Sequence, residues 1–325
     1  MIISKTPFRI SLIGGGTDFP SYYKKSPGLV IGGTIDKYCY VSARFLPNVF
    51  KYKHRVVWSK NEVVKNNNQI IHPTVRAVFN YLKINQGLEI HYQGDLQKNS
   101  GLGTSSAFCV GLIKSLKGLH NKGINKEILA KTAINIEHNV MKEKCGSQDQ
   151  IWAAFGGFNA IEFKGKSFKV KKLGINKSKL SNLSRNLFLI YTGINKFSHF
   201  VEKDKISKLN KNLNNKNKIY NLAKSFRYEV QNNKSSDFIG TILNEYWSIK
   251  KSLSNKVSNN KINEIYNEAL KSGASGGKII GSGGGGFLLI HCKQKKHRSL
   301  KKKLNKLPII KFNFVEKGSE IIFKS

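Results

Sequence analysis

The sequence contains no apolar run long enough to cross a membrane, and its first residues leave no room for a signal peptide. It has only four cysteines, and none of them stands at a spacing typical of a zinc site. Its eight histidines include no H-x-x-x-H pair. We therefore expect a cytoplasmic protein with reduced thiols and with no disulfide and no structural metal.

Acidic residues are also scarce. The chain has 19 Asp and Glu and 56 Lys and Arg, which gives a formal net charge of +37. A charge of this size is compatible with nucleic-acid binding. Lysine is, however, spread over the whole chain together with asparagine, as in Asn66–Asn68 and in residues 203–218. This distribution favours a general compositional bias, and the positive field would also collect small phosphorylated ligands.

The segment from Ser100 to Ala107 is the most informative part of the chain. It reads Ser100-Gly101-Leu102-Gly103-Thr104-Ser105-Ser106-Ala107, between an expected strand at 88–92 and an expected helix at 105–119. Glycines let the backbone approach an anion, and a helix N-terminus presents unpaired N–H groups. The loop lacks the lysine of a P-loop and the third Gly or Ala of a dinucleotide fingerprint. We predict a phosphate site, with an ordinary serine-rich helix start as the alternative.

Two carboxylates downstream are candidates for metal binding and proton transfer. Glu137 lies in an apolar helical pattern at 126–142, and Asp149 follows Cys145-Gly146 at the start of another apolar segment. Together they could hold a divalent cation and accept a proton. The alternative is that each is a solvated surface residue, which is the commoner role of carboxylates.

A second glycine-rich region covers residues 273–286 and ends in four consecutive glycines, Gly283–Gly286. Glycine weakens helices and strands alike, so neither propensity explains this run. A flexible linker is one interpretation, but an apolar strand is expected directly afterwards, at 287–292. We therefore expect the backbone here to pass very close to another part of the molecule.

The order of the expected elements predicts an α+β protein without internal repeats. A chain of 325 residues with 39% hydrophobic residues can bury one large core or two modest ones. A Lys-, Ser- and Asn-rich connection at 171–186 predicts domains at 1–178 and 179–325. Further strands are expected at 2–12, 38–45, 56–58, 157–163, 167–173, 187–191 and 309–314. Further helices are expected at 74–82, at 297–306, and as polar helices between the strand at 187–191 and about residue 270.

The loop at 100–107, the two carboxylates at 137 and 149 and the glycine-rich region at 273–286 follow one another in the order found in the GHMP kinases. The chain resembles this family, which includes galactokinase, homoserine kinase and mevalonate kinase. The resemblance extends to about Ile290 and includes Thr6–Phe19, which is similar to the entry motif of galactokinase. Arg9, Thr17 and Asp18 match that motif. The resemblance implies an N-terminal domain like ribosomal protein S5 domain 2, a ferredoxin-like C-terminal domain and an active site in the cleft between them.

The entry motif differs from that of galactokinase at Gly15-Gly16, which replaces a Glu-His pair. This glycine form, together with Tyr191-Thr192-Gly193 and Ser198, is similar to the branch that contains heptose 7-phosphate kinases and fucokinase-like enzymes. Two positions depart from the family pattern. Lys98-Asn99 stands where the family often has Pro, and Lys196 stands where it often has Arg.

The resemblance also implies ATP as the phosphate donor, with Mg²⁺, and a role for each matching residue. Asp149 and Arg9 match the catalytic positions, and Ser105 and Glu137 match the Mg²⁺ ligands. The ATP phosphate loop corresponds to Gly101, Leu102, Gly103, Thr104, Ser105 and Ser106, with the Gly281–Gly286 run packed beneath it. The sugar-binding positions correspond to Gly14, Gly15, Gly16, Thr17, Asp18, Tyr191, Gly193, Lys196 and Gly284.

The implied activity is phosphorylation of D-glycero-D-manno-heptose 7-phosphate at O1. Gly15-Gly16 removes a bulky pair that includes a negative charge, and we expect Lys37 and Lys196 near the sugar site as counter-charges for the substrate phosphate. A kinase of an unphosphorylated sugar, such as fucose or galactose, is the first alternative. A basic nucleic-acid-binding protein is the second. We expect a monomer or homodimer without a membrane partner.

Overall fold

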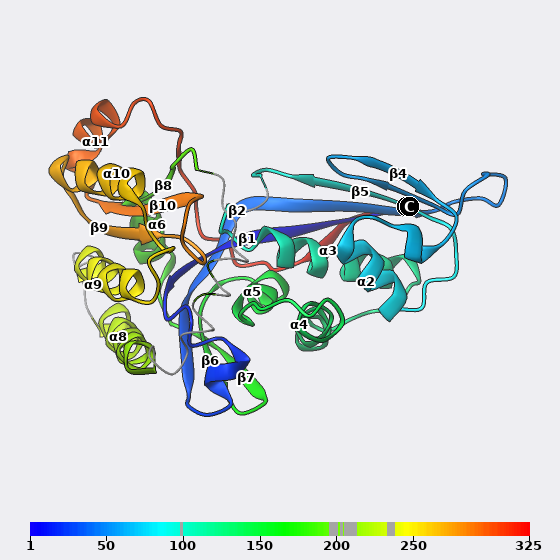
Figure 1. Cartoon of the computed structure of the whole chain (residues 1–325), viewed down its shortest axis with the longest axis horizontal. Coiled ribbons are helices and arrows are strands. Elements are labelled where there is room, and N and C mark those ends of the chain that lie inside the picture. Colours follow the sequence, from blue (N-terminus) through cyan, green and yellow to red (C-terminus); the bar gives the residue numbers. More distant parts are fainter. Residues whose placement is uncertain (98–99, 195–200, 202–203, 205–212, 233–237) are drawn as a thin grey trace.

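The computed structural model describes residues 1–97, 100–194, 201, 204, 213–232 and 238–325, which form two units, each built on its own sheet (Figure 1). The first unit contains β1 (Ile2–Ile13), α1 (Pro20–Tyr23), β2 (Gly28–Phe45), β3 (His54–Val57), β4 (Asn61–Val64), η1 (Asn67–Gln69), α2 (Pro73–Tyr81), β5 (Leu88–Gly94), α3 (Thr104–Leu119), α4 (Lys126–Asn135), the π-helical turn η2 (Ile136–Val140), α5 (Gln148–Phe155), β6 (Phe158–Lys164) and β7 (Ser167–Lys172). The second unit follows with α6 (Lys177–Arg185), β8 (Leu187–Tyr191), α8 (Leu213–Asn232), α9 (Phe238–Ser252), α10 (Asn260–Lys271), β9 (Ala274–Ile279), β10 (Phe287–Cys292), η3 (Gln294–Lys296), α11 (His297–Lys303) and β11 (Ile309–Ile310), before β12 (Glu320–Lys324) ends the chain.

The first sheet has eight strands in the order β12-β1-β2-β5-β3-β4, with β6 paired to β2 and β7 to β6. The 18-residue strand β2 connects its parts, because Gly28–Gly33 pairs with β6 and Cys39–Phe45 pairs with β5. Helix α3 packs on β1 and β2, and α5 packs on α3 and α4. The Arg9 N–H donates to the Leu102 carbonyl at 3.0 Å, so the loop before α3 is attached to the middle of β1.

The second sheet has four antiparallel strands in the order β11-β8-β10-β9. Helices α9 and α10 pack against it, and α8 packs on α9 and also on β1 and β2 of the first sheet. Every residue of β10 is buried. The N–H of Phe287 at its start donates to the Ser100 carbonyl at 3.3 Å, which attaches the second sheet to the loop before α3.

The glycine-rich run between β9 and β10 passes close to the backbone of neighbouring segments, as the sequence predicts. A β-carbon on Gly283 would lie 2.9 Å from Val257 Cα, and one on Gly285 would lie 2.8 Å from the Ile194 carbonyl oxygen. Both glycines have φ in the positive region, at 112° and 155°. A larger residue would therefore be excluded by sterics and by backbone conformation.

The α+β class is confirmed, but several element boundaries differ from the predictions. The predicted strand at 309–314 ends at Ile310, because the chain leaves the second sheet and Phe314 bridges to Ile35 of the first. The predicted connection at 171–186 contains helix α6, whose N-cap Asn176 accepts a hydrogen bond from Lys179 N at 2.8 Å. Strands β4, β9 and β12 are not among the strands that the sequence predicts.

The end of the chain returns to the first unit. Strand β12 pairs with β1, and the Met1 ammonium group donates to the Ser325 carbonyl at 3.0 Å. The predicted second domain, 179–325, therefore includes a strand of the first sheet. Its pairing depends on a contact between the two ends of the chain, which no local sequence pattern reports.

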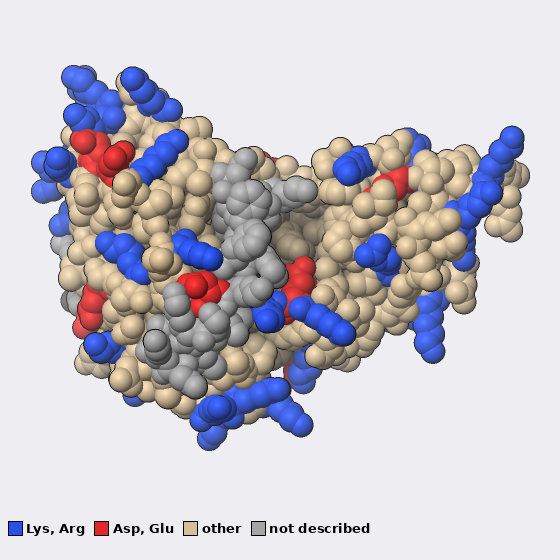
Figure 2. All heavy atoms as spheres, in the orientation of Figure 1, with Lys and Arg blue, Asp and Glu red and all other residues tan. Residues whose placement is uncertain are grey.

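The surface carries basic side chains on both units. In the view of Figure 2, Lys and Arg side chains lie over both units. In the part of the chain that the structure describes, no helix combines the length and the apolar character that a membrane crossing requires.

Candidate active site

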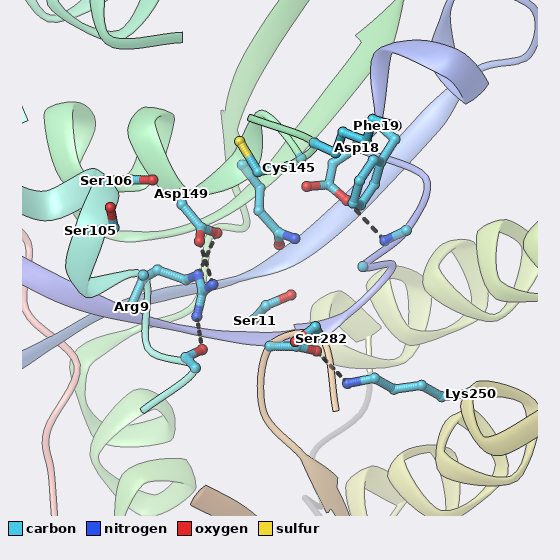
Figure 3. A pocket seen from close by; sticks show the side chains of 18 of the residues that line it. Arg9, Ser11, Asp18, Phe19, Ser105, Ser106, Cys145, Asp149, Lys250 and Ser282 are labelled. Carbon is cyan, nitrogen blue, oxygen red and sulfur yellow. Dashed lines mark hydrogen bonds and ion pairs between the residues drawn. The ribbon is translucent and has the colours of Figure 1, made fainter. Parts of the chain in front are cut away.

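A pocket of about 390 Å³ lies between the two units. Figure 3 shows side chains that line the pocket. One wall comes from β1, the loop before α3, η2 and the start of α5, and the other comes from α8, α9 and the end of β9. Its lining includes these predicted site residues: Arg9, Gly15, Gly16, Asp18, Gly101, Gly103, Thr104, Ser105, Ser106, Glu137 and Asp149.

The loop before α3 has the backbone shape of an anion site. Gly101 and Gly103 have φ values of 87° and 73°, in the left-handed region that favours glycine. Gly103 is the N-cap of α3 and has no side chain with which to cap the helix, so the first N–H groups of α3 lie beside the pocket. A β-carbon on Gly103 would lie 3.3 Å from Asp149 Oδ2, which shows how closely the loop passes over that carboxylate.

Arg9 and Asp149 form a bidentate ion pair at the centre of this wall (Figure 3). Arg9 Nε donates to Asp149 Oδ1 at 2.7 Å, and Arg9 Nη2 donates to Oδ2 at 2.6 Å. The third guanidinium nitrogen, Nη1, donates to the Gly101 carbonyl at 2.6 Å. The side chain of Arg9 is 6% exposed and that of Asp149 is 23% exposed, so the carboxylate has the more open position.

Glu137 is a buried carboxylate of the pocket, with 2% of the residue exposed. It lies on the π-helical turn η2, where the predicted helix at 126–142 changes its geometry after Asn135. Its Oε2 accepts hydrogen bonds from Ser106 Oγ, at 2.9 Å, and from Gln150 Nε2. Burial, together with the nearby Glu143 carboxylate, raises the pKa of Glu137 to about 8.

The two serines at the start of α3 have different surroundings. The family resemblance implies Ser105 and Glu137 as Mg²⁺ ligands. In the structure the hydrogen bond to Glu137 comes from the neighbouring Ser106, which is 6% exposed. Ser105 also lines the pocket but is exposed. The helix rotates successive side chains by about 100°, so only one of the two can face η2.

The donor set beside Glu137 fits a magnesium ion. Within the described residues, no group of three or more His, Cys, Asp or Glu side chains could hold a metal ion. Glu137 Oε1 is buried and has no hydrogen-bond partner among the same residues, so a cation would satisfy it. A carboxylate oxygen, a serine hydroxyl and the oxygens of a bound phosphate would together supply the hard ligands that Mg²⁺ prefers.

The turn Gly14–Phe19 forms another side of the pocket. Asp18 Oδ1 accepts a hydrogen bond from Gly16 N at 2.8 Å, and the Asp18 carbonyl accepts one from Ser147 N at 2.9 Å. Tyr246 of α9 donates its hydroxyl hydrogen to the Gly15 carbonyl at 3.0 Å. A β-carbon on Gly15 would lie 3.1 Å from that hydroxyl oxygen, so the tyrosine occupies the space beside the missing side chain.

Some predicted site residues do not line the pocket. Gly14 turns the backbone against Leu29, Thr17 donates its hydroxyl hydrogen to the Gly14 carbonyl at 2.8 Å, and Leu102 is buried in the core. Tyr191 packs on Phe287, and Gly193 and Gly284 lie in turns with positive φ. Lys196 and Ser198, with Lys98 and Asn99, lie outside the described residues.

The structure adds three buried lysines to the lining, Lys216, Lys250 and Lys278, which the sequence analysis did not single out. Lysine is so abundant in this chain that no local pattern distinguishes them. Lys37, which the sequence analysis expects near the sugar site, is outside the lining. Its Nζ lies 3.5 Å from Asp36 Oδ1, on the side of β2 that faces Asn313.

Two parts of the chain match the two domains of one known protein family. Residues 68–157 match the GHMP kinases N terminal domain, and residues 236–308 match the GHMP kinases C terminal domain. The first match contains the loop before α3, Glu137 and Asp149, and the second contains the glycine-rich run before β10.

The chain is 30% identical to the D-glycero-alpha-D-manno-heptose 7-phosphate kinase of Campylobacter jejuni, over 98% of this chain and 97% of that protein. Among solved structures it is similar to a D-glycero-D-manno-heptose 1-phosphate kinase from Bacteroides thetaiotaomicron, with a TM-score of 0.81, 21% identity and 100% of both chains covered. The mevalonate kinase of Methanococcus jannaschii matches with a TM-score of 0.74 and 21% identity, over 96% of this chain and 98% of that chain. At these identities the structural matches establish the fold.

The ion pair beside the loop gives a first prediction. We expect Arg9→Lys to lower the free energy of unfolding by about 2 kcal/mol, because a lysine cannot replace three charge-assisted hydrogen bonds in one plane. Arg44→Lys is the matched control, since Arg44 also pairs with a carboxylate, that of Glu89, but its side chain is 47% exposed. It should cost less than about 1 kcal/mol. Urea denaturation measures both, and equal losses would contradict the central role of Arg9.

Proposed function

The chain belongs to the GHMP kinase family, as a sugar kinase similar to heptose phosphate kinases, and we propose that it transfers the γ-phosphate of ATP to O1 of D-glycero-D-manno-heptose 7-phosphate. The observation that carries this proposal is the Arg9–Asp149 pair beside the anion-binding start of α3, inside the pocket between the two units. The full-length similarity to the Campylobacter jejuni enzyme supports the substrate class.

Asp149 is the proposed acceptor of the hydroxyl proton. In the transfer, a bond forms between sugar O1 and the γ-phosphorus while the bond from that phosphorus to ADP breaks. The O1 proton passes to Asp149, whose carboxylate plane is held by the two hydrogen bonds from Arg9. The 23% exposed carboxylate is open enough to meet a bound hydroxyl, and its fixed orientation lowers the entropic cost of the reaction.

Arg9 has a second proposed role, in charge stabilisation. Its guanidinium is directed at both Asp149 and the Gly101 carbonyl, so it lies between the acceptor and the loop that binds phosphate. Negative charge on the transferred group therefore develops near a fixed cation and near the N–H groups at the start of α3. Because these groups are already in place, little reorganisation is required during the transfer.

Glu137 and Ser106 are the proposed protein ligands of Mg²⁺. When bound, the ion neutralises charge on the β- and γ-phosphates. Gln150 and Ser106 fix the orientation of the Glu137 carboxyl group through Oε2. This leaves Oε1 for the ion. Burial raises the pKa of Glu137, and a bound cation would favour its ionised form, so the side chain would serve as a negatively charged ligand once the ion is present.

The turn at Gly15-Gly16 supports a substrate larger than galactose. A β-carbon on Gly16 would meet no atom within 4 Å, so a side chain at this position would extend into open space beside Asp18. With glycine there, the space is left for the substrate, and the pocket wall lacks the negative charge that galactokinase has at this pair. A phosphorylated sugar would then meet less electrostatic repulsion.

The first functional prediction is that Asp149→Asn lowers kcat by a factor on the order of 10²–10⁴, because the amide cannot accept the proton. The KM for ATP should change little, because asparagine keeps the shape of the side chain and Asp149 is proposed to meet the sugar hydroxyl rather than ATP. Steady-state kinetics with ATP titration measure both constants. Asp36→Asn, at a carboxylate outside the pocket, is the control. A kcat equal to that of the wild type would remove Asp149 from the mechanism.

The proposed metal site gives a prediction that tests whether Ser105 or Ser106 is the ligand. Glu137→Gln and Ser106→Ala should raise the Mg²⁺ concentration that gives half-maximal activity, because each removes or weakens a hard oxygen ligand. Ser105→Ala is the matched control and should behave like the wild type. A larger effect of Ser105→Ala than of Ser106→Ala would restore the assignment made from the sequence, and unchanged Mg²⁺ dependence in all variants would contradict both.

The substrate is tested by comparing kcat/KM for D-glycero-D-manno-heptose 7-phosphate, free heptose, fucose and galactose. We expect the phosphorylated sugar to be preferred by a factor on the order of 10–100, the contribution of a charge-assisted contact to the phosphate. The product should carry the new phosphate at O1, which phosphorus NMR identifies. Equal or better use of an unphosphorylated sugar would instead support the alternative, a fucose- or galactose-type kinase.

A further inference from the structure

The pocket contains two buried, uncharged polar side chains that have no part in the proposed phosphate transfer. Ser11 is 4% exposed and Gln148 is 9% exposed, and both line the pocket. Ser11 Oγ and Gln148 Oε1 have no hydrogen-bond partner in the part of the chain that the structure describes. A buried polar atom without a partner costs free energy, so a ligand that pairs with it gains affinity.

Ser11 lies two residues after Arg9 on β1. This part of β1 pairs without a bulge with β2, from Arg9 opposite Thr34 to Ser11 opposite Gly32. Side chains two residues apart on a strand lie on the same face, about 7 Å from each other along the strand. Both residues line the pocket, and Figure 3 shows the Ser11 side chain within it. The Ser11 hydroxyl is therefore the next side-chain group on the face of β1 that carries Arg9.

Gln148 directly precedes Asp149, at the first position of α5. A β-carbon on Gly15 would lie 3.7 Å from Gln148 Nε2 and also 3.7 Å from Ser11 Oγ. The two side chains, one from α5 and one from β1, therefore converge on the same space beside Gly15. A glutamine amide can both donate and accept hydrogen bonds, and so can a serine hydroxyl.

The missing side chain at Gly15 keeps this space in the pocket. Gly14 and Gly16 have positive φ, at 91° and 104°, whereas the φ of Gly15 lies outside that region. The backbone conformation therefore does not require glycine at position 15. A larger residue would fill the space in front of Ser11 and Gln148 and would approach the hydroxyl of Tyr246 to 3.1 Å.

The chemistry of the two side chains favours a hydroxyl group as the ligand. Neither carries a charge, so a phosphate or a cation would form stronger bonds elsewhere in the pocket, at the start of α3 or at Glu137. A sugar hydroxyl donates one hydrogen bond and accepts others, so it can pair with a serine and a glutamine at once. The two residues are also neighbours in sequence of Arg9 and Asp149, where the reacting hydroxyl is proposed to lie.

Resting on the proposed function, we propose that Ser11 and Gln148 bind the hydroxyl group on C2 of the sugar substrate. When O1 is at Asp149, this hydroxyl is the adjacent one on the ring. The two hydrogen bonds position the ring for transfer to O1. They also select sugars that have a hydroxyl group at this carbon, because without it both buried polar groups remain unpaired.

The test compares Ser11→Ala and Gln148→Met with Ser4→Ala. Ser4 is a buried serine of the same strand, but its hydroxyl donates to the Gly111 carbonyl at 2.9 Å and it does not line the pocket. We expect each pocket variant to lower kcat/KM for heptose 7-phosphate by a factor of about 2–10, the contribution of one hydrogen bond. The KM for ATP should not change. The Ser4 variant should match the wild type with both substrates.

The 2-deoxy analogue of heptose 7-phosphate tests which hydroxyl group is bound. The wild type should use it less well than the parent sugar by a factor on the order of 10–100, because two buried groups stay unpaired. The pocket variants should use the analogue at least as well as the wild type does, since the contact is already absent. An equal loss with the parent and the 2-deoxy sugar would overturn the assignment.

Urea denaturation without substrate distinguishes binding from a structural role. Ser11→Ala and Gln148→Met remove unpaired buried atoms, so the denaturation midpoint should stay the same or rise, whereas Ser4→Ala should lower it. A lower midpoint together with wild-type kinetics would assign the two residues to the fold and contradict the proposal.

Failure of the proposed function is visible in the wild-type kinetics alone, as a preference for another sugar. The C2 contact is then tested with that sugar and its 2-deoxy form, by the same comparison of variants.

Discussion

The guanidinium of Arg9 joins three segments that are remote in the chain. It holds the carboxylate of Asp149 on α5 and the carbonyl of Gly101 in the loop before α3, and the backbone N–H of the same residue holds Leu102. Arg9 itself lies in the middle of β1, where the residues from Pro7 to Ile13 are all buried. A planar fork of donors on a rigid strand therefore holds both the loop before α3 and the carboxylate of Asp149 in place. Other residues that line the pocket lie around this ion pair.

The two walls of the pocket divide the chemistry between them. The first unit supplies the carboxylates, the hydroxyls and the helix N-terminus, which suit a cation and the phosphates of a nucleotide. The second unit supplies buried lysines and the hydroxyl of Tyr246, which reaches across to the Gly15 carbonyl. Helices α8 and α9 pack on β1, so the second wall is attached to the strand that carries Arg9.

The sequence predicted those features whose cause is local. The glycines at 101 and 103 adopt positive φ, the helix that follows them starts at Thr104, and the run before β10 passes close to neighbouring backbone, all as expected from residue type and spacing. Glu137 and Asp149 line one pocket, as their resemblance to a known family implied. The predicted ends of helices and strands agreed less well with the structure. The helix through Glu137 changes to a π-helical turn, and the strand expected at 309–314 stops at Ile310, because contacts with other segments decide where each element ends.

By itself the sequence determined the fold class and the glycine- and hydroxyl-rich loop before a helix, and it indicated candidate site residues, since these depend on short patterns of glycine, hydroxyl and carboxylate residues. Only the tertiary structure decided which serine meets Glu137, because one residue along a helix rotates the side chain by about 100°. It also decided which of the many lysines enter the pocket. Lys37 lies beside Asp36, whereas Lys216, Lys250 and Lys278, far along the chain, are buried and line the pocket. A charge becomes functional through its burial and its neighbours, and neither is a property of local sequence.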